Sequence, residues 1–495
     1  MTPDALEPLS HSELVSLIMA LQGRQDALEA ENARLRAEVE ALKAEATKNS
    51  GNSSKPPSRD PAAERERQAE ARRAKRQAAA GGKRRRPGKQ PGSPGSTLQM
   101  SDDPDEVITH TPGICRGCGA DLSDAAVTGE TRRQVVDLPE VKPKVTEHRA
   151  QTRRCECGTD NTAAFPEHVR APISYGPKVR AVVIYLLARQ HIPVERCAEA
   201  MRDLFGIKIS TGTIDAVYVE AARRLSGFIK ALVALLRCLP VLHADETTDR
   251  IGTKNCWMHV VSTDTYTLIH ASATRGFDAV RAAGVLIGYR GVVIHDRLAL
   301  YWKLKDAKHG VCSAHLLRDL ASVAAVAAQA AWATALAALL VEINAACDQA
   351  RSNGYKRLVP RLERTFTERY DTLVAQGIAA NPDPAPGHER DRLDRKSYNL
   401  AAAFSTHKKA ILAYMGNLDV SFTNNQGERD LRPVKLHRKI SSCFKSQAGA
   451  ERFAMVRSYL STTRKNDIPA IDALTRLFNG DPWMPPQPQA APLTR

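Results

Sequence analysis

The sequence predicts a multidomain protein built around an α/β domain with a helical insertion, preceded by a coiled coil, a cysteine-bearing ribbon and a helical region. Three observations carry this prediction: a leucine repeat near the N-terminus, two close pairs of cysteines, and a strand-rich pattern that begins at Leu239 and precedes a long helical stretch. A chain of 495 residues has room for several domains and at least one large hydrophobic core.

The N-terminal segment predicts a parallel two-stranded coiled coil over residues 11–47, and hence self-association of the chain. Oppositely charged side chains flank the repeat, and Asn32 occupies an a position, where it favours two helices in register. A lone amphipathic helix packed on its own domain is the alternative. The repeat places a leucine at every seventh residue: Leu14, Leu21, Leu28, Leu35 and Leu42.

Residues 48–105 have the composition of a disordered basic linker, rich in Ser, Pro, Gly, Arg and Lys and without apolar periodicity. The whole chain carries a formal net charge of +16, which favours a polyanionic partner. The run around Arg84, Arg85 and Arg86 resembles a basic arm that contacts phosphates and reaches into the minor groove of DNA. A plain solvated linker is the alternative.

Residues 106–170 predict a zinc ribbon. Two short cysteine knuckles, each followed by glycine, supply the four thiolates of a closed tetrahedral site for one structural Zn²⁺. Alternating apolar runs at 135–138 and 141–145 suggest the strands of the ribbon. The second knuckle is one residue shorter than usual, which keeps His148 and His168 as substitute ligands. The expected ligands are Cys115, Cys118, Cys155 and Cys157.

The other cysteines are scattered, so the ten cysteines indicate a reduced intracellular protein with one metal site and no disulfide framework. The first residues are polar and acidic, and predict no secretion signal. The apolar stretch 321–341 is dominated by alanine and interrupted by polar residues. It therefore predicts a buried helix rather than a membrane span.

Residues 171–235 predict three helices with apolar residues at helical spacing. Gly206 makes a turn, and Ser210 caps the helix that follows, which is typical of a helix-turn-helix. A purely structural bundle is the alternative. The candidates for DNA contact in this region are Lys208, Thr211 and Thr213.

Residues 236–465 predict an α/β domain of ribonuclease-H-like fold with a helical insertion at about 314–420, and residues 466–495 are expected to form a C-terminal tail. In this fold a first strand, two more strands, a helix and a fourth strand follow one another, and the fourth strand lies beside the first. The strand-like runs are 239–244, 256–262, 266–273 and 292–295, with a helix at 277–287 before the last.

Three acidic residues stand where this fold would bring them together. Asp245 and Asp296 follow the first and fourth strands, and Glu428 lies near the start of a later helix. Carboxylate oxygens suit Mg²⁺, and a two-metal site that cuts a phosphodiester bond needs ions roughly 3.5–4 Å apart. We expect Asp245 to bridge two Mg²⁺ ions, for which Mn²⁺ could substitute. Asp296 and Glu428 would bind one ion each.

Each acidic residue also has an alternative role. Glu246 or Asp249 could stand in for Asp245, and Asp296 could be a simple turn residue. Glu428 fits a capping box, in which its carboxylate reaches back to the start of its own helix. The joint occurrence of the three residues, in this order and on a basic chain, favours the metal site.

The sequence resembles the insertion sequence 66 family of bacterial transposases over nearly its whole length. Residues 52–57 read NSSKPP after the leucine repeat, and the cysteine knuckles follow. Arg297 and Ser313 depart from residues that many members carry. The motifs that carry the resemblance are HADET at 243–247, HD at 295–296 with Tyr301, CSAHLLR at 312–318, and TNNQGERDLR at 423–432 with Arg438 and Lys439.

The resemblance implies a DDE transposase that binds the terminal inverted repeats of its insertion sequence, hydrolyses phosphodiester bonds at the element ends and joins the 3′ hydroxyls to target DNA. It implies double-stranded DNA and accessory transposition proteins as partners, no membrane, and a place in the bacterial cytoplasm with the nucleoid. Pro433 would kink the helix after Glu428. The candidates for DNA contact on that helix are Arg429, Arg432, Lys435, Arg438 and Lys439.

Two other classes of function compete with this interpretation. A stand-alone nuclease of the same fold would not need a coiled coil, a ribbon and a basic arm to pair two DNA ends. A DNA-binding regulator, or a catalytically decayed transposase, would use only the N-terminal modules. The intact set of acidic residues argues against decay.

Overall fold

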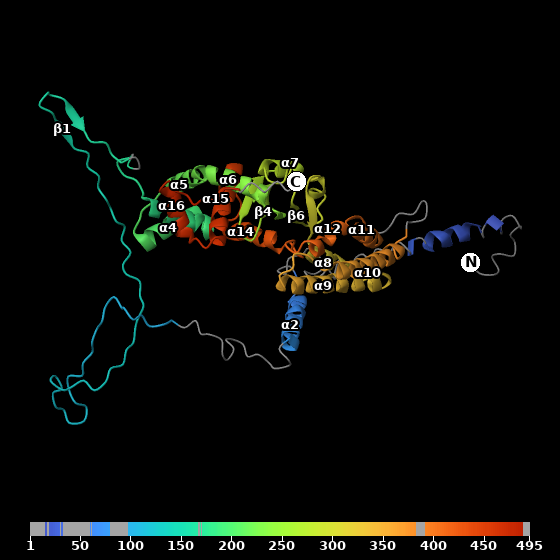
Figure 1. Cartoon of the computed structure of the whole chain (residues 1–495), viewed down its shortest axis with the longest axis horizontal. Helices are drawn as coiled ribbons and strands as arrows, with labels where there is room; N and C mark the ends of the chain where they lie inside the picture. Colours follow the sequence, from blue (N-terminus) through green and yellow to red (C-terminus); the bar gives the residue numbers. More distant parts are fainter. Residues whose placement is uncertain are drawn as a thin grey trace. The chain divides into compact units, whose positions relative to one another are not determined.

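The computed structural model of the chain is shown in Figure 1. It describes residues 15–16, 19–29, 31–32, 60, 62–79, 98–166, 169, 171–382 and 392–488. The chain divides into two compact units, each described here by itself. The larger comprises Met1–Pro61, Glu147–Arg202 and Lys208–Arg495, and the smaller comprises Ala62–Thr146 and Asp203–Ile207.

A five-stranded mixed sheet forms the centre of the larger unit, in the order β5–β4–β3–β6–β7. β3, β4 and β5 are antiparallel neighbours, whereas β6 pairs with β3, and β7 with β6, in parallel. α7 (Phe277–Ala283) lies in the crossover that a parallel pair requires. The strands are β3 (Val241–Ile251), β4 (Lys254–Ser262), β5 (Thr267–Ser272), β6 (Val292–His295) and β7 (Lys308–Val311).

The first strand of the sheet runs further than the sequence predicts. Its expected end was residue 244, but β3 pairs with β4 as far as Ile251 opposite Lys254. Gly252 occupies the tight turn between them with a left-handed backbone, φ +57°, a conformation that glycine adopts without steric cost. Asp245 therefore lies within a strand rather than after one.

Two long helices, α14 (Asn425–Ser441) and α15 (Gln447–Lys465), pack against β3, β4 and β5. Pro433 lies inside α14, and the helix continues through it, so the helix is not divided at the proline. The apolar side chains between these helices and the sheet form one buried cluster. Its larger members are Met258, Val260, Ile269, Leu431, Val434, Phe444 and Phe453.

Hydroxyl groups of α15 cover the outer edge of β5. The backbone N–H of Ile269 donates to Ser458 Oγ at 2.8 Å, and that of Thr267 donates to Thr462 Oγ1 at 3.1 Å. An edge strand otherwise presents unpaired backbone groups that invite another strand. The side chains of α15 thus complete the hydrogen bonding of the sheet at this edge.

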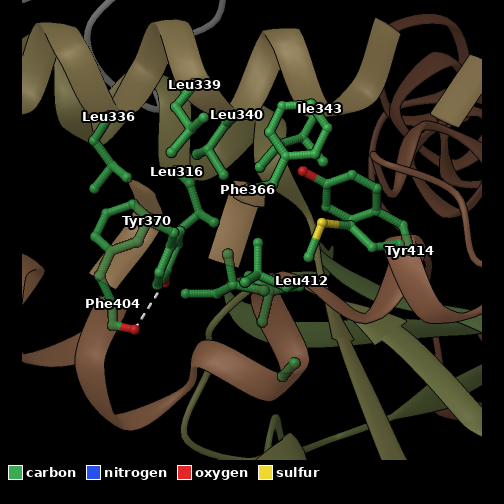
Figure 2. Close-up of a cluster of buried hydrophobic side chains, with 14 of the residues drawn as sticks. Leu316, Leu336, Leu339, Leu340, Ile343, Phe366, Tyr370, Phe404, Leu412 and Tyr414 are labelled. Atoms are coloured by element: carbon green, nitrogen blue, oxygen red, sulfur yellow. Dashed lines mark hydrogen bonds between the residues drawn. The ribbon is translucent and has the colours of Figure 1, made fainter. Parts of the chain in front are cut away.

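The helices of the insertion between β7 and α14 form one hydrophobic core together with apolar side chains of β6 and β7 (Figure 2). Tyr370 donates a hydrogen bond to the Phe404 carbonyl at 2.8 Å inside this core. At the base of the insertion, Ser313 N donates to Phe422 O at 3.0 Å, so the insertion enters and leaves at adjoining points. Its helices are α8 (Ser313–Val323), α9 (Ala330–Ser352), α10 (Pro360–Ala379), α11 (Arg392–Thr406), α12 (Lys408–Ile411) and α13 (Ala413–Gly416).

The alanine-rich stretch of the sequence lies largely in α9. Among the described residues, Ala327–Ser352 is long and apolar enough to cross a membrane by length and composition alone. Leu336, Leu340 and Ile343 on α9 are buried in the core of the insertion (Figure 2). This burial is typical of a core helix, as the composition predicted.

The segment expected to be a C-terminal tail is instead part of the folded unit. α16 (Ala470–Phe478) packs against α3 (Pro177–Ile184), and Leu474 and Leu477 are buried. The Arg180 guanidinium lies 5.3 Å from the ring centre of Phe478. The expectation was wrong because this short helix packs its apolar face on α3, η3 (Tyr185–Arg189) and α5 (Thr211–Arg224). The other helices before the sheet are α4 (Val194–Phe205) and α6 (Ser226–Cys238).

The segment expected to be a disordered linker contains the helix α2 (Ala62–Ala79). Glu64 pairs with Arg67 and also accepts a hydrogen bond from Gln68 at 3.0 Å. Such pairs three and four residues apart stabilise a helix without any apolar face, which is why apolar periodicity gave no signal here.

The expected strands of the ribbon are also misplaced. Residues 135–138 and 141–145 are irregular, with Leu138 and Val145 exposed. The hairpin of β1 (Thr152–Arg154) and β2 (Asp160–Thr162) instead carries the second cysteine knuckle in its turn. A sequence in which apolar residues alternate does not form a strand unless neighbouring elements bury those apolar side chains.

Of the predicted coiled coil, residues 15–16, 19–29 and 31–32 are helical, and Leu21 and Leu28 are exposed. Leu14, Leu35 and Leu42 lie outside the described residues. The coiled coil and the self-association that depends on it therefore stay predictions.

The packing of α16 generates a stability prediction. Leu474→Ala should lower the free energy of unfolding by about 2–5 kcal/mol, because it removes a fully buried side chain. Asp472→Ala, on the exposed side of the same helix, should change it by less than about 0.5 kcal/mol. Urea denaturation of both variants measures the difference, and equal midpoints would contradict the packed position of α16.

Candidate active site

The register of β3 and β6 brings Asp245 and Asp296 to the same level of the sheet. Val241 pairs with Val292, and His243 with Ile294, in parallel. Asp245 and Asp296 are separated in sequence by the same number of residues as these pairs. They therefore lie opposite each other if the register is continued by two residues. Asp296, directly after the end of β6, therefore lies beside Asp245 in the middle of β3.

The first turn of α14 lies directly on β3 at Asp245. A Cβ atom placed on Gly427 would come within 3.2 Å of the Asp245 Cβ and 3.1 Å of Asn424 Oδ1. Glycine is therefore the residue that allows so close an approach. Glu428, the next residue, enters the site from the first turn of the helix.

Asn424, which is 1% exposed, ties the start of α14 to the sheet. Its Nδ2 donates to the Ala244 carbonyl at 2.8 Å, and its Oδ1 lies 2.9 Å from His243 Nδ1. Its backbone N–H donates to Cys312 Sγ at 3.1 Å. The expected capping box does not form, because Asn424 is the N-cap of α14 and the residue three positions after it is Gly427, which has no carboxylate. Glu428 is therefore available for the site.

The acidic side chains act on one another through their charges. Burial, followed by the negative charges of Glu246, Asp296 and Glu428, raises the pKa of Asp245 to about 7. Like charges brought together in this way disfavour ionisation, and a bound cation would relieve the repulsion. The three carboxylates expected from the sequence thus lie near enough to interact.

Glu246 is held by other partners. Its carboxylate forms an ion pair with Arg275 at 2.6 Å and accepts a hydrogen bond from the Tyr301 hydroxyl at 2.7 Å. Arg275 also stacks over the Trp257 ring, with 4.9 Å between guanidinium carbon and ring centre. Glu246 therefore acts as a fixed negative neighbour of Asp245.

Asp249 and Asp296 differ in what surrounds them. Asp249 is fully buried further along β3, where burial raises its pKa to about 6 and Arg438 acts against that rise. Asp296 accepts a hydrogen bond from Leu298 N at 3.0 Å, as a turn residue would. The charge of Asp296 nevertheless acts on Asp245, whereas that of Asp249 is not among the causes of its shift.

Two further ligand-type side chains lie beside Glu428. Atoms of Cys312, His315 and Glu428 that can bind a metal all lie within 4.8 Å of one another. Burial raises the pKa of the Cys312 thiol and lowers that of His315, which keeps both groups neutral. Neither residue had been given a role from the sequence, although C-x-x-H directly after a strand puts Cys312 at the N-cap and His315 on the first turn of the next helix.

The expected DNA-contacting residues fall into several places. Lys208 and Thr211 are exposed at the start of α5, and the Thr213 hydroxyl bonds the Ser210 cap at 2.9 Å. Arg84, Arg85 and Arg86 lie outside the described residues.

On α14, Arg438 lies near Asp249. The other α14 candidates line a cavity of about 510 Å³, termed here the basic pocket: Arg429, Arg432, Lys435 and Lys439.

Each cysteine knuckle brings its own pair of thiols together. Hydrogen bonds from Cys118 and Gly117 lower the pKa of Cys115, and hydrogen bonds with Thr159 lower that of Cys157 to about 7. A lowered pKa favours the thiolate, which is the form that binds Zn²⁺. All ten cysteines of the chain are free, as expected for a protein without disulfides.

A mixed sheet that gathers carboxylates beneath a helix, on a basic chain with cysteine knuckles, defines an enzyme of the transposase or nuclease class. Residues 172–452 match the model of the Transposase IS66 family, and the chain belongs to that family. Residues 112–158, which hold the four knuckle cysteines, match the zinc-finger binding domain of transposase IS66. The protein is therefore a zinc-finger transposase, which acts on DNA.

Two further comparisons found similar sequences. Residues 1–98 match a family of unknown function. The chain is 23% identical to the uncharacterized protein y4hP of Sinorhizobium fredii (strain NBRC 101917 / NGR234) over 429 residues. That similarity covers 77% of this chain and 74% of the relative.

The tether formed by Asn424 generates a prediction about stability and activity. Asn424→Ala should lower the free energy of unfolding by about 1–3 kcal/mol, because buried polar groups lose their partner. DNA cleavage should fall further than DNA binding, because Glu428 loses its fixed place. Asn255→Ala, at an exposed position of β4, is the control. An Asn424→Ala enzyme with wild-type stability and cleavage would rule out the tether.

The zinc finger generates a separate prediction. Freshly purified reduced protein should hold roughly one zinc ion per chain, and Cys118→Ser should lose most of it. Cys238→Ser removes an exposed cysteine outside the knuckles and should keep the metal. Elemental analysis of the three proteins measures this, and an unchanged zinc content in Cys118→Ser would exclude the four-thiolate site.

Proposed function

We propose that this transposase binds the terminal inverted repeats of its own insertion sequence, cuts the DNA at the element ends and joins the freed 3′ hydroxyls to target DNA. Asp245, Asp296 and Glu428 are its catalytic carboxylates. The observation that carries the proposal is the convergence of these side chains from β3, from the end of β6 and from the first turn of α14.

The order of the strands supports a ribonuclease-H-like core. β3, β4 and β5 form an antiparallel meander, and β6 and β7 add in parallel on the other side of β3. In that fold the first and fourth strands are neighbours and each presents a catalytic aspartate. The third acidic residue then comes from a helix that packs on the same sheet, the place that α14 occupies.

The donor set fits a divalent metal ion with oxygen ligands. Three carboxylates act on one another in a partly buried site, and the repulsion shown by Asp245 is what a cation would offset. Within the described part of the chain, the Glu428 carboxylate has no hydrogen-bond partner, which leaves both of its oxygens for a metal. Mg²⁺ bound there would stabilise charge on the attacked phosphate and on the leaving oxygen.

Neighbouring residues hold Glu428 in place and keep the other carboxylates of β3 away from the metal site. Asn424 and Gly427 set the place of Glu428 against Asp245, and Tyr301 and Arg275 keep the Glu246 carboxylate turned to its own partners. Glu246 and Asp249 are poor substitutes for Asp245, because the first is engaged and the second is buried elsewhere. For these reasons Asp245, rather than Glu246 or Asp249, would be the metal ligand from β3.

The N-terminal modules would supply recognition and pairing of the DNA ends. The zinc finger and the exposed start of α5, with Lys208 and Thr211, offer surfaces for the terminal repeat. The exposed leucines Leu21 and Leu28 favour pairing of two chains through a coiled coil. Two chains paired in this way could hold the two ends of one element.

Cleavage of a labelled duplex that carries the element's terminal repeat tests the proposal. Asp245→Asn and Glu428→Gln should each lower Mg²⁺-dependent nicking at the repeat boundary by more than about a hundredfold. The expected loss is this large because mutating even a residue that only supports a metal ligand typically lowers activity or metal affinity 10–100-fold. Glu368→Gln removes an exposed carboxylate from α10 and should cut at the wild-type rate.

The outcomes separate the competing functions. Cutting at random positions would indicate a nuclease without end recognition. Tight binding of the repeat without cutting by wild type would indicate a regulator or a decayed enzyme. Full cutting by Asp245→Asn would overturn the assignment of the site while leaving the family membership intact.

A further inference from the structure

The basic pocket lies where α14, α15 and η3 meet, and its walls come from all three elements. α14 contributes residues that the sequence analysis had already named. η3 and α15 contribute cations that no sequence motif indicated. The cations at the centre of the argument are Arg189, Arg432, Lys435, Lys439, Arg457 and Arg464.

The positive charge of this pocket is not neutralised by the protein. Its acidic wall residue, Asp430, already pairs with Lys465 at 2.8 Å. Lys465 is further held by the Thr263 and Tyr266 carbonyls. Within the described residues, the remaining cations on the wall form no ion pair: Arg189, Arg429, Arg432, Lys435, Lys439, Arg457 and Arg464. Cations gathered without counter-charges indicate a site for an anion.

A buried arginine of the wall lacks part of its hydrogen bonding. Arg457 is 3% exposed, and its Nη1 donates to the Ala188 carbonyl at 3.2 Å, whereas its Nε has no partner. Burial, with the nearby positive charges of Arg189 and Arg464, lowers the pKa of Arg457 to about 10. A buried charge in such surroundings is costly unless it is paired, and an anion in the pocket would pair it.

The backbone beside Arg457 is unusual as well. η3 is a single π-helical turn that ends at Arg189, and His191 follows with a left-handed backbone, φ +60°. Turns of this kind and strained non-glycine residues concentrate at functional sites. His191 is 1% exposed with an unpartnered Nδ1, and the Ser441 hydroxyl at the end of α14 bonds its carbonyl. The wall of the pocket is thus fixed in place.

The row of cations on α14 begins next to the catalytic carboxylate. At a rise of about 1.5 Å per residue, Lys435 lies roughly 10 Å and Lys439 roughly 16 Å along the helix from Glu428. One strand of duplex DNA advances about 3.4 Å per nucleotide. For a duplex whose axis runs along α14, the pocket would therefore lie roughly three to five nucleotides from the position of the cut.

We propose that the basic pocket binds a backbone phosphate of the cleaved DNA strand, about three to five nucleotides from the cut. The proposal rests on the proposed function, since it takes the DNA strand in the catalytic site as its starting point. Arg457 and Arg464 from α15 and Arg189 from η3 hold this phosphate together with Lys435 on α14. The contact fixes the register of the strand without reading its sequence.

Binding of the terminal-repeat duplex, measured without metal ion at several salt concentrations, tests the contact. Arg464→Gln and Lys435→Gln change exposed side chains, so both proteins should fold. Each should reduce the slope of log affinity against log salt by about 0.9, the value for one phosphate contact. That slope corresponds to roughly eightfold weaker binding at ~0.1 M salt. Lys445→Gln, an exposed cation outside the pocket, should change neither.

Neutral methylphosphonate linkages place the contact on the strand. One such linkage, moved from the first to the seventh nucleotide beside the cut, should weaken binding by wild type at one or two positions within the expected stretch. Arg464→Gln should show no further loss at those positions, because the contact is already gone. An unchanged salt slope in Arg464→Gln, or an undiminished methylphosphonate effect, would overturn the proposal.

A soluble polyphosphate is the other source of the same chemistry. Tripolyphosphate titrated into the full chain should bind weakly. Tight binding of tripolyphosphate that depends on Arg464, together with an unchanged salt slope for DNA in Arg464→Gln, would overturn the proposal and indicate a polyphosphate site. These measurements require no cleavage. If the pocket does not bind DNA, the enzyme will still cut and its pocket variants will bind DNA as tightly as wild type. If the proposed function is wrong, the wild-type protein will not cut the terminal repeat.

Discussion

The geometry of the candidate site depends on one buried amide, that of Asn424. It joins the start of α14 to the carbonyl of Ala244 and the ring of His243, the two residues that precede Asp245 in β3. Glycine at 427 lets the helix approach, and the amide holds it there. Residues that are far apart in the sequence, Asp245 and Glu428, thereby become neighbours through a side chain that itself carries no charge.

The helix held in this way has an order of charge that suits both its stability and its role. Glu428 lies in the first turn of α14, and Arg438 and Lys439 lie in the last. An acid near the N-terminus and bases near the C-terminus both interact favourably with the helix dipole. The same arrangement puts the metal-binding carboxylate of Glu428 at the start of α14 and the cations that would contact phosphate along the rest of the helix. Stability and function therefore favour the same arrangement of charged residues.

The strands and the two aspartates could be predicted because a strand leaves a local pattern. Val292 to His295 is a continuous apolar run that ends in Asp296, and parallel pairing with β3 sets the register. Asn424, Cys312 and His315 could not be assigned in this way, since their partners lie on other elements. α16 and α2 were missed for opposite reasons. The first is stable only when packed on α3, and the second is stabilised by its own charge pairs.

The hydrogen bond from Ser313 N to Phe422 O makes the helical insertion a closed loop whose two ends stay together. The free energy of closing a flexible loop changes by only about 0.6 kcal/mol when its length doubles. Helices could therefore be lengthened, shortened or replaced during evolution far from this base, while Asp296 before the loop and Glu428 after it keep their distance. The insertion is therefore the part of this enzyme whose length could change with the least effect on the distance between Asp296 and Glu428.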